Sequence, residues 1–231
     1  MWLLAVDTST RDASVALLSD DRLVALVAPP GDEQHSVRLF RDIERALAEA
    51  GLKLADIDVY AVANGPGAFT ALRVGLTAVK GLAEMHGKPV VAVSVLEAVC
   101  ERAQACGLLV PVVDAYRGQI FGSVYEKTSE DIVRRQPECV LALDEFLATL
   151  ARDGVDAKTS TLVSPHLAHL VPRLVQSSFA SAPREQIPPV LADAVAWRAR
   201  AKLVRGRVTD ALRLEANYVR RSDAELLWKP K

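Results

Sequence analysis

The sequence predicts an α/β protein made of two related subdomains, the second of them abbreviated. Three observations lead to this prediction: the order of strands and helices in the first half, a weaker repeat of that order in the second half, and an ordinary globular composition. The chain has 231 residues, of which 50% are hydrophobic and 25% charged. That length is enough for one large domain or for two small ones of roughly 100 residues each.

The first half, residues 1–106, has the element order βββαβαβα. Three short apolar or alternating runs predict consecutive antiparallel strands, namely WLLAV, ASVALL and RLVALVA. Apolar residues then recur at helical spacing over 36–50, and Gly51 ends this helix. The following runs predict a strand, a helix, a strand and a final helix: VYAVA, TALRVGLTAVKGLAEMHG, PVVAV and SVLEAVCERAQACG. Ser94 and Glu97 occupy capping-box positions in that final helix.

The second half, residues 107–231, repeats this order less regularly. LLVPVVDAYRGQIFGSVYE predicts a strand, a tight turn and a second strand, and ECVLAL can serve as the third. The segments that continue as helix, strand and helix are DEFLATLARDG, STLVS and PHLAHLVPRLVQ. SSFASAPREQIPPV reads as a loop before the last helix, LADAVAWRARAKLV. This pseudo-repeat is the order of the duplicated ribonuclease-H-like fold, found in the actin and Hsp70-like ATPase superfamily.

Two turns rich in small residues are candidates for holding phosphate groups. In that superfamily the turn after the first strand binds phosphates through backbone N–H groups and small hydroxyls, with an aspartate near the metal ion. DTST fits this chemistry, and the glycines of NGPG allow close backbone approach at a helix N-terminus. The candidate residues of such a nucleotide site, which would be vestigial, are Asp7, Thr8, Ser9, Thr10, Gly65, Gly67 and Asp114.

The alternative is that these residues only build turns. Asp and Thr are common in hairpins, Gly-Pro-Gly often joins a strand to a helix, and no Lys follows the glycines as it would in a P-loop. The sequence leaves both interpretations open.

The helix predicted over 70–85 has more apolar surface than its own sheet needs. Its polar residues fall in a stripe only about 60° wide. Residues on its other faces include a small-xxx-small pair, which permits close helix approach. A docking surface shared with the helix over 36–50 is therefore expected, and its residues are His35, Ser36, Leu39, Ile43, Ala71, Gly75, Ala78 and Leu82. The alternative is that the second half of the chain covers this face.

Charge and cysteine content exclude several classes of function. The formal net charge of −1 gives no overall basic field for binding a nucleic-acid backbone. The N-terminal apolar run stops at Asp7 without a preceding basic segment, which predicts neither a signal peptide nor a membrane span and hence a cytoplasmic protein. Cys100, Cys106 and Cys139 have no metal-ligand spacing, and we expect reduced, mostly buried thiols.

Several motifs in the same order resemble one known family: LLAVDTSTRDASVAL, HSVRL, NGPGAFTALRVGLTAVKGLA, PVVAVSVLEAV, PVVDAYRGQIFGSVY and NYVRR. They are similar to the TsaB family, also called YeaZ, of bacterial proteins required for threonylcarbamoyladenosine formation in tRNA. The likeness runs almost the full length and is strongest over 1–125. Ala68 and Ala71 depart from the family's usual Ser and Gly, and both keep a small side chain.

The resemblance implies an accessory subunit rather than an enzyme. It implies pairing with a catalytic paralogue, TsaD, to modify adenosine 37 of tRNAs that read ANN codons. An ATPase subunit, TsaE, would join the assembly, ATP or ADP would act at the level of the complex, and tRNA would be bound through the complex. The chain alone would form a homodimer through the same two helices. No cofactor and no membrane are expected for this chain.

The paralogue binds its metal through H-x-x-x-H, and the matching positions here are Val95 and Val99. Neither side chain can ligate a metal, so no catalytic residue and no metal site are predicted. His166 and His169 lie three residues apart on a predicted helix without a third ligand.

Two other functions remain open at this stage. The chain could be an actin-like-fold ATP-binding enzyme or a metallopeptidase acting on its own, which would use Asp7 and Asp114 or an unrecognised ligand set. It could also touch tRNA through a basic run near the C-terminus, which consists of Arg198, Arg200, Lys202, Arg205, Arg207, Arg220 and Arg221.

Overall fold

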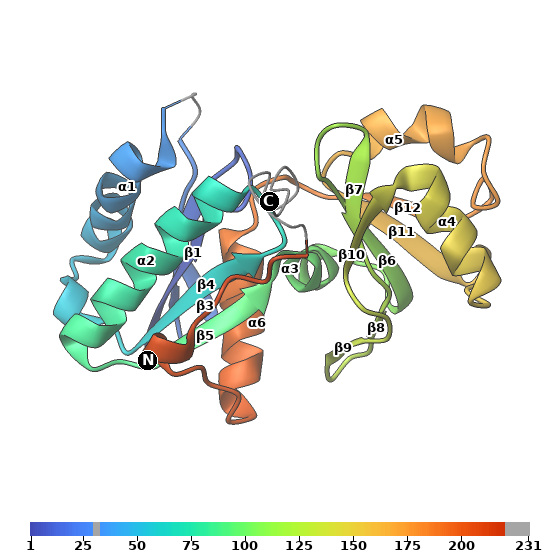
Figure 1. Cartoon of the computed structure of the whole chain (residues 1–231). Helices are drawn as coiled ribbons and strands as arrows, with labels where there is room; N and C mark the ends of the chain where they lie inside the picture. Colours follow the sequence, from blue (N-terminus) through green and yellow to red (C-terminus); the bar gives the residue numbers. More distant parts are fainter. Residues whose placement is uncertain (30–32, 220–231) are drawn as a thin grey trace, which may run out of the picture.

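A computed structural model describes residues 1–29 and 33–219 as two subdomains that lie side by side (Figure 1). The first contains a five-stranded sheet of order β3-β2-β1-β4-β5. Its strands are β1 (Trp2–Asp7), β2 (Ser14–Ser19), β3 (Arg22–Val27), β4 (Val59–Gly65) and β5 (Val90–Ser94). The first three strands are antiparallel, whereas β4 and β5 run parallel to β1. This is the predicted ribonuclease-H-like arrangement.

Helices cover both faces of the first sheet. α1 (His35–Ala50) and α2 (Phe69–His86) share one hydrophobic core with the face that carries Leu4, Val6 and Tyr60. α1 begins at His35 after Gln34, and no side chain caps it. It ends, as predicted, at Gly51, whose φ of 67° is left-handed and suits a residue without a Cβ. A short 3-10 helix, η1 (Leu54–Asp56), leads into β4.

The second sheet repeats the strand order of the first. Its central order is β10-β7-β6-β11-β12, with β8 paired to β6 and β9. The strands are β6 (Gly107–Asp114), β7 (Gln119–Gly122), β8 (Tyr125–Lys127), β9 (Ile132–Arg134), β10 (Cys139–Ala142), β11 (Ser160–Ser164) and β12 (Arg184–Gln186). α4 (Leu143–Arg152) and α5 (Leu167–Leu174) pack on one of its faces.

Two details of this sheet differ from the sequence prediction. The segment expected to be a loop contains β12, which pairs in parallel with β11 through Leu162 and Arg184. Three residues are too few to show a strand pattern, so only the pairing partner reveals it. The predicted second strand is also divided into β7 and β8, which pair with opposite ends of β6.

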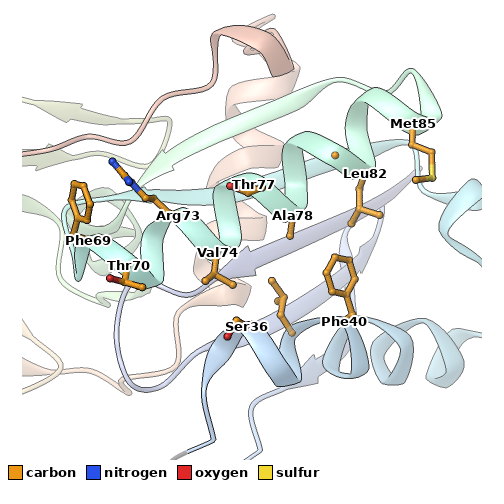
Figure 2. Close-up of a pocket in the computed structure, with 12 residues that line it drawn as sticks. Ser36, Phe40, Phe69, Thr70, Arg73, Val74, Thr77, Ala78, Leu82 and Met85 are labelled. Atoms are coloured by element: carbon orange, nitrogen blue, oxygen red, sulfur yellow. The ribbon is translucent and has the colours of Figure 1, made fainter.

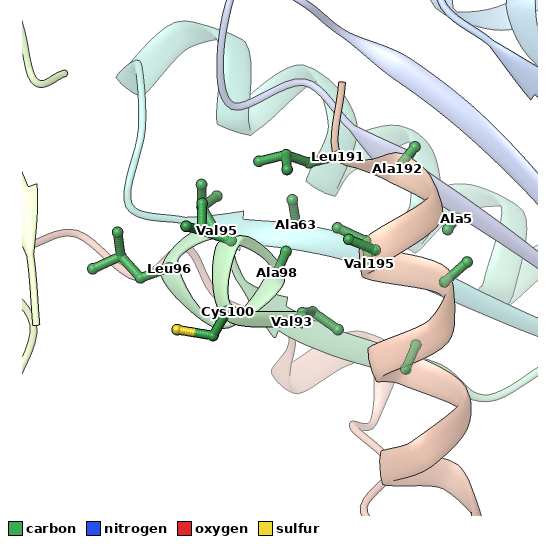
Figure 3. Packing of buried hydrophobic residues seen from close by; sticks show 14 of the residues in the cluster. Ala5, Ala63, Val93, Val95, Leu96, Ala98, Cys100, Leu191, Ala192 and Val195 are labelled. Atoms are coloured by element: carbon green, nitrogen blue, oxygen red, sulfur yellow. The ribbon is translucent and has the colours of Figure 1, made fainter. Parts of the chain in front are cut away.

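The last helix of each half lies between the two subdomains. α3 (Val95–Arg102) contacts β6 of the second sheet, and α6 (Ala192–Val204) packs across β1, β2 and β5 of the first. Figure 3 shows Val195 of α6 pointing toward Ala63 of β4 and Ala98 of α3, in one buried cluster that also contains Ala5 of β1. The predicted boundary at residue 106 therefore assigns α6 to the wrong sheet, because an apolar helix face does not specify which sheet will cover it.

Polar contacts fasten α3 at both ends. The Ser94 hydroxyl accepts a hydrogen bond from the N–H of Leu96, so the predicted cap is confirmed. At the other end, Nζ of Lys127 donates to the carbonyls of Cys100, Glu101 and Ala103 at 2.6–3.0 Å. A lysine from the second sheet thus satisfies the free carbonyls of a helix that begins in the first subdomain.

Candidate functional site

An apolar groove of about 680 Å³ lies between α1 and α2, and we call it the α1–α2 groove. Figure 2 shows Val74, Ala78 and Leu82 of α2 pointing toward Ser36 and Phe40 of α1. The full lining consists of Ser36, Leu39, Phe40, Phe69, Thr70, Arg73, Val74, Thr77, Ala78, Gly81, Leu82 and Met85. Among the described residues, none from the second half of the chain lines this groove.

Half of the predicted docking residues line the groove. Ser36, Leu39, Ala78 and Leu82 do so, although Leu39 and Leu82 are largely buried and form its floor. Ile43 does not, because it is buried in the core of the first subdomain. The groove thus lies between the same two helices as the predicted docking surface.

His35, Ala71 and Gly75 contact the turn after β1 rather than the groove. Nε2 of His35 lies 2.8 Å from the carbonyl of Thr10, and the carbonyl of Ala71 accepts a hydrogen bond from Oγ1 of Thr8. A Cβ on Gly75 would lie only 2.5 Å from the same Oγ1. Ala71 and Gly75 therefore leave room for the turn after β1 of the same chain. This corrects their predicted assignment to a partner interface.

The exposed apolar side chains that sequence reasoning missed are large ones at the rim of the groove. Phe40 is 52% exposed, Met85 is 76% exposed, and Val37 lies one turn before Phe40 on the same helix. Phe40 neighbours the buried Leu39 and so read as part of the core. Leu39 and Phe40 are adjacent on the helix and therefore point about 100° apart, so both cannot face one sheet. This spacing could have indicated that Phe40 is exposed.

An aromatic and cationic cluster closes one end of the groove. The ring of Phe69 stacks on that of Tyr218 with centroids 4.8 Å apart. The guanidinium carbon of Arg73 lies 3.9 Å from the Phe69 centroid, and Nε of Arg73 donates to the Tyr218 hydroxyl at 3.0 Å. A residue from the far end of the chain therefore helps to shape the surface of α2.

The candidate phosphate turn is packed against the candidate phosphate loop. Asp7, Thr8 and Ser9 are almost fully buried, and Oδ1 of Asp7 accepts from the Ser9 N–H at 2.9 Å. Burial raises the pKa of the Asp7 carboxyl, while the hydrogen bond from Ser9 acts in the opposite direction. A Cβ on Gly67 would lie 2.7 Å from the Ser9 carbonyl, which accepts a hydrogen bond from Ala68. The turn and the loop are therefore in direct contact at Gly67 and Ala68.

The predicted nucleotide residues are divided by the structure. Ser9, Thr10, Gly67 and Asp114 line a cavity of about 250 Å³ between the subdomains, together with His166 and His169. Asp7 and Thr8 lie beneath it, and Gly65 instead faces the Asn217 carbonyl, which would be 2.8 Å from an added Cβ. Oδ1 of Asp114 accepts from the Tyr116 N–H within its own turn.

Within residues 1–29 and 33–219, no group of three or more His, Cys, Asp or Glu side chains could hold a metal ion. Val95 and Val99, which the resemblance matches to the paralogue's metal ligands, are buried in the core. In the same part of the chain, no helix has the length and apolar character needed to cross a membrane.

The basic run is largely engaged in ion pairs. Arg198 is 2% exposed and binds Glu97 at 2.6 Å and Asp131 at 2.7 Å. Lys202 shares Glu97, and Arg200 pairs with Asp21. Arg205 and Arg207 approach Asp131, whereas Arg220 and Arg221 lie outside the described residues. A continuous basic surface is thus not formed by 198–207, because its first member, Arg198, is a buried structural side chain.

Comparison with known proteins identifies the family. The family model described as TsaD, tRNA N6-adenosine threonylcarbamoyltransferase, matches residues 29–207. The tRNA threonylcarbamoyladenosine biosynthesis protein TsaB of Bacillus subtilis is 32% identical over 65% of this chain. The Escherichia coli protein of the same name is 30% identical over 57%. The chain belongs to the TsaB (YeaZ) family. The matched segments span 66% and 58% of those two relatives.

Solved structures of this family share the fold. A Pseudomonas aeruginosa protein described as similar to the peptidase YEAZ superposes with a TM-score of 0.78 at 26% identity, covering 95% of this chain and 99% of that one. YeaZ from the same organism gives 0.75 at 28% identity, covering 94% and 99%. The two ribonuclease-H-like subdomains are therefore those of the TsaB family.

Proposed function

We propose that this chain is a non-catalytic subunit for the formation of N6-threonylcarbamoyladenosine at position 37 of tRNAs that read ANN codons. The α1–α2 groove docks the catalytic paralogue, a tRNA N6-adenosine threonylcarbamoyltransferase of the TsaD type. The observation that carries this proposal is the exposed apolar groove on a member of a family whose relatives are named as threonylcarbamoyladenosine biosynthesis proteins.

The character of the groove supports docking. Phe40, Phe69 and Met85 expose large apolar side chains along it, and contiguous apolar patches on a soluble protein mark interaction sites. A paralogue with the same fold has two helices in the equivalent places, so two helices from each partner can pair. In the absence of the paralogue, a second copy of the chain covers the same groove, because a two-fold pair uses one patch twice.

The side chains at the positions where a related enzyme would carry its catalytic groups support an accessory role. By the resemblance, Val95 and Val99 stand where the paralogue has metal ligands, and both are buried, as is Asp7. Binding of ATP or ADP and of tRNA is accordingly proposed for the assembled complex, which includes the ATPase TsaE, and not for this chain alone.

Two substitutions at the rim of the groove test the proposal. Phe40→Glu and Met85→Glu each place a charge in the apolar interface and should weaken binding of the organism's own TsaD-type paralogue at least about 30-fold, as for a central interface residue. Isothermal titration calorimetry gives the dissociation constants. Because both side chains are more than half exposed, folding should be retained.

Val175→Glu is the matched control, since Val175 is 53% exposed after α5 in the second subdomain. It should bind as wild type does. Wild-type strength in the two groove variants would contradict the docking site. Magnesium-dependent ATP turnover by the isolated chain, lost in Asp114→Asn, would favour the alternative of an independent enzyme.

A further inference from the structure

Among the described residues that line the α1–α2 groove, Arg73 is the only charged one. The others are apolar or carry at most a hydroxyl group. Figure 2 shows Arg73 beside Phe69 at the N-terminal end of α2, away from Met85 at the opposite end. The groove therefore has a direction: one end is cationic and the other is apolar.

The Arg73 side chain is held in place by two aromatic rings. Its guanidinium carbon lies 3.9 Å from the centroid of Phe69, and its Nε donates to the hydroxyl of Tyr218 at 3.0 Å. Tyr218 is itself stacked on Phe69. Across residues 1–29 and 33–219, the two terminal nitrogens of Arg73 have neither a hydrogen-bond acceptor nor a carboxylate partner. Within that part of the chain, nothing occupies them against a ligand that approaches from outside.

A docked apolar helix would take this guanidinium out of water. An arginine that loses its hydration without gaining a partner charge is strongly unfavourable. A carboxylate is the acceptor that matches the paired terminal nitrogens, since both oxygens can be bound at once. Because Phe69 and Tyr218 already restrict the side chain, little conformational freedom is lost on binding.

We propose that the partner helix that fills the α1–α2 groove carries an aspartate or glutamate that pairs with Arg73, and that Tyr218 is a positioning residue for this pair. The inference rests on the proposed function, because it specifies the chemistry of the partner at the same site. It also fixes the orientation of the partner helix: its acidic residue lies at the N-terminal end of α2 and its apolar residues lie toward Met85.

Charge reversal provides the first test. The dissociation constant for the organism's TsaD-type paralogue is measured by calorimetry for wild type, Arg73→Gln, Arg73→Glu and Tyr218→Phe. Arg73→Gln should weaken binding at least about 30-fold, as expected when one member of a buried charge pair is removed, and Arg73→Glu should weaken it further. Tyr218→Phe keeps the ring but not the hydroxyl, so a loss of about 3–10-fold is expected.

Arg152→Glu is the matched control, because Arg152 is an exposed arginine at the end of α4 in the second subdomain. It should leave binding unchanged. Raising the salt concentration should weaken wild type more than Arg73→Gln, since only the wild-type interface contains the ion pair. A merely structural role for Arg73 or Tyr218 would not alter this salt dependence.

A charge swap completes the test. Each aspartate and glutamate on the paralogue's two docking helices is replaced by arginine in turn, and one of these variants should restore binding to Arg73→Glu. If wild type binds and Arg73→Glu binds equally well, or if no swap restores binding, the inference is overturned while the proposed docking stands. If wild type does not bind the paralogue, the proposed function itself fails.

Self-association is followed in the same variants by analytical ultracentrifugation. A second copy presents Glu44 and Glu84 on its own α1 and α2. If Arg73→Glu disrupts only the homodimer and leaves paralogue binding intact, the carboxylate belongs to a second copy and the inference is overturned.

Discussion

Asp7 shows how a residue suited to phosphate chemistry can be used within a fold. Its carboxylate ends β1, as it would in a nucleotide-binding relative, but it is fully buried and only one of its oxygens accepts a hydrogen bond. Burial raises its pKa, so the folded protein binds a proton there more readily than the unfolded chain does. The charged form of Asp7 therefore costs stability at neutral pH.

Asp7→Asn should stabilise the protein at pH 7.5 by roughly 1–3 kcal/mol, the usual cost of an unsatisfied buried polar group. Proton binding by Asp7 stabilises the folded protein. This stabilisation is fully present below the ordinary pKa of 3.8, and it is lost as the pH rises through the raised pKa of the folded state. The advantage of Asn should thus shrink at pH 4.5. Thermal melts at both pH values measure it, with Asp12→Asn in the same turn as control. An advantage that does not depend on pH would contradict this account.

At the scale of the element, α2 presents two different surfaces that both contain glycine. Gly75 faces inward, where an added Cβ would lie 2.5 Å from Oγ1 of Thr8. Gly81 lines the groove and has no atom within 4 Å of the place where a Cβ would stand. The same substitution on one helix should therefore have opposite effects.

Gly81→Ala should raise stability by about 0.5–1 kcal/mol, because alanine is the better helix former. Gly75→Ala should lower stability despite the same gain in propensity, since Thr8 must move and its hydrogen bond to the Ala71 carbonyl is lost. Urea unfolding of the two variants decides the matter. If Gly75→Ala is as stable as Gly81→Ala, the turn is not packed against α2 as described.

The sequence predicted most elements correctly because their hydrophobic periods are long and regular. The two docking helices and the strand order of the first subdomain rest on such periods. Which residues of α2 face a partner could not be read in the same way, since Gly75 and Ala78 are both small and only the position of Thr8 separates them. The role of Tyr218 likewise depends on a contact between segments 145 residues apart.

On the scale of the whole molecule, the last helix of each subdomain packs against the other subdomain. α3 follows the first sheet but contacts β6 of the second, and α6 follows the second sheet but covers β1, β2 and β5 of the first. Arg198 on α6 strengthens this packing by pairing with Glu97 on α3 and with Asp131 between β8 and β9. The two halves therefore form one structural unit.

Arg198→Met should lower the free energy of unfolding by about 1.5–3 kcal/mol, because Glu97 and Asp131 lose their buried partner but keep Lys202 and Arg205 nearby. Arg200→Met, on the same helix, removes a pair with the exposed Asp21 and should cost less than about 1 kcal/mol. Chemical denaturation followed by circular dichroism compares them. Equal losses for the two variants would mean that the buried pair does not join the subdomains.

The position of α6 also has a consequence during translation. The strands of the first sheet are all synthesised by Ser94, but the helix that covers one face of that sheet begins at Ala192. During synthesis, this face of the sheet therefore stays uncovered until α6 has emerged from the ribosome, about 100 residues after the last strand of that sheet. A stalled or prematurely terminated chain would thus expose the apolar residues that pack beneath α6, and such surfaces make incomplete chains prone to aggregation.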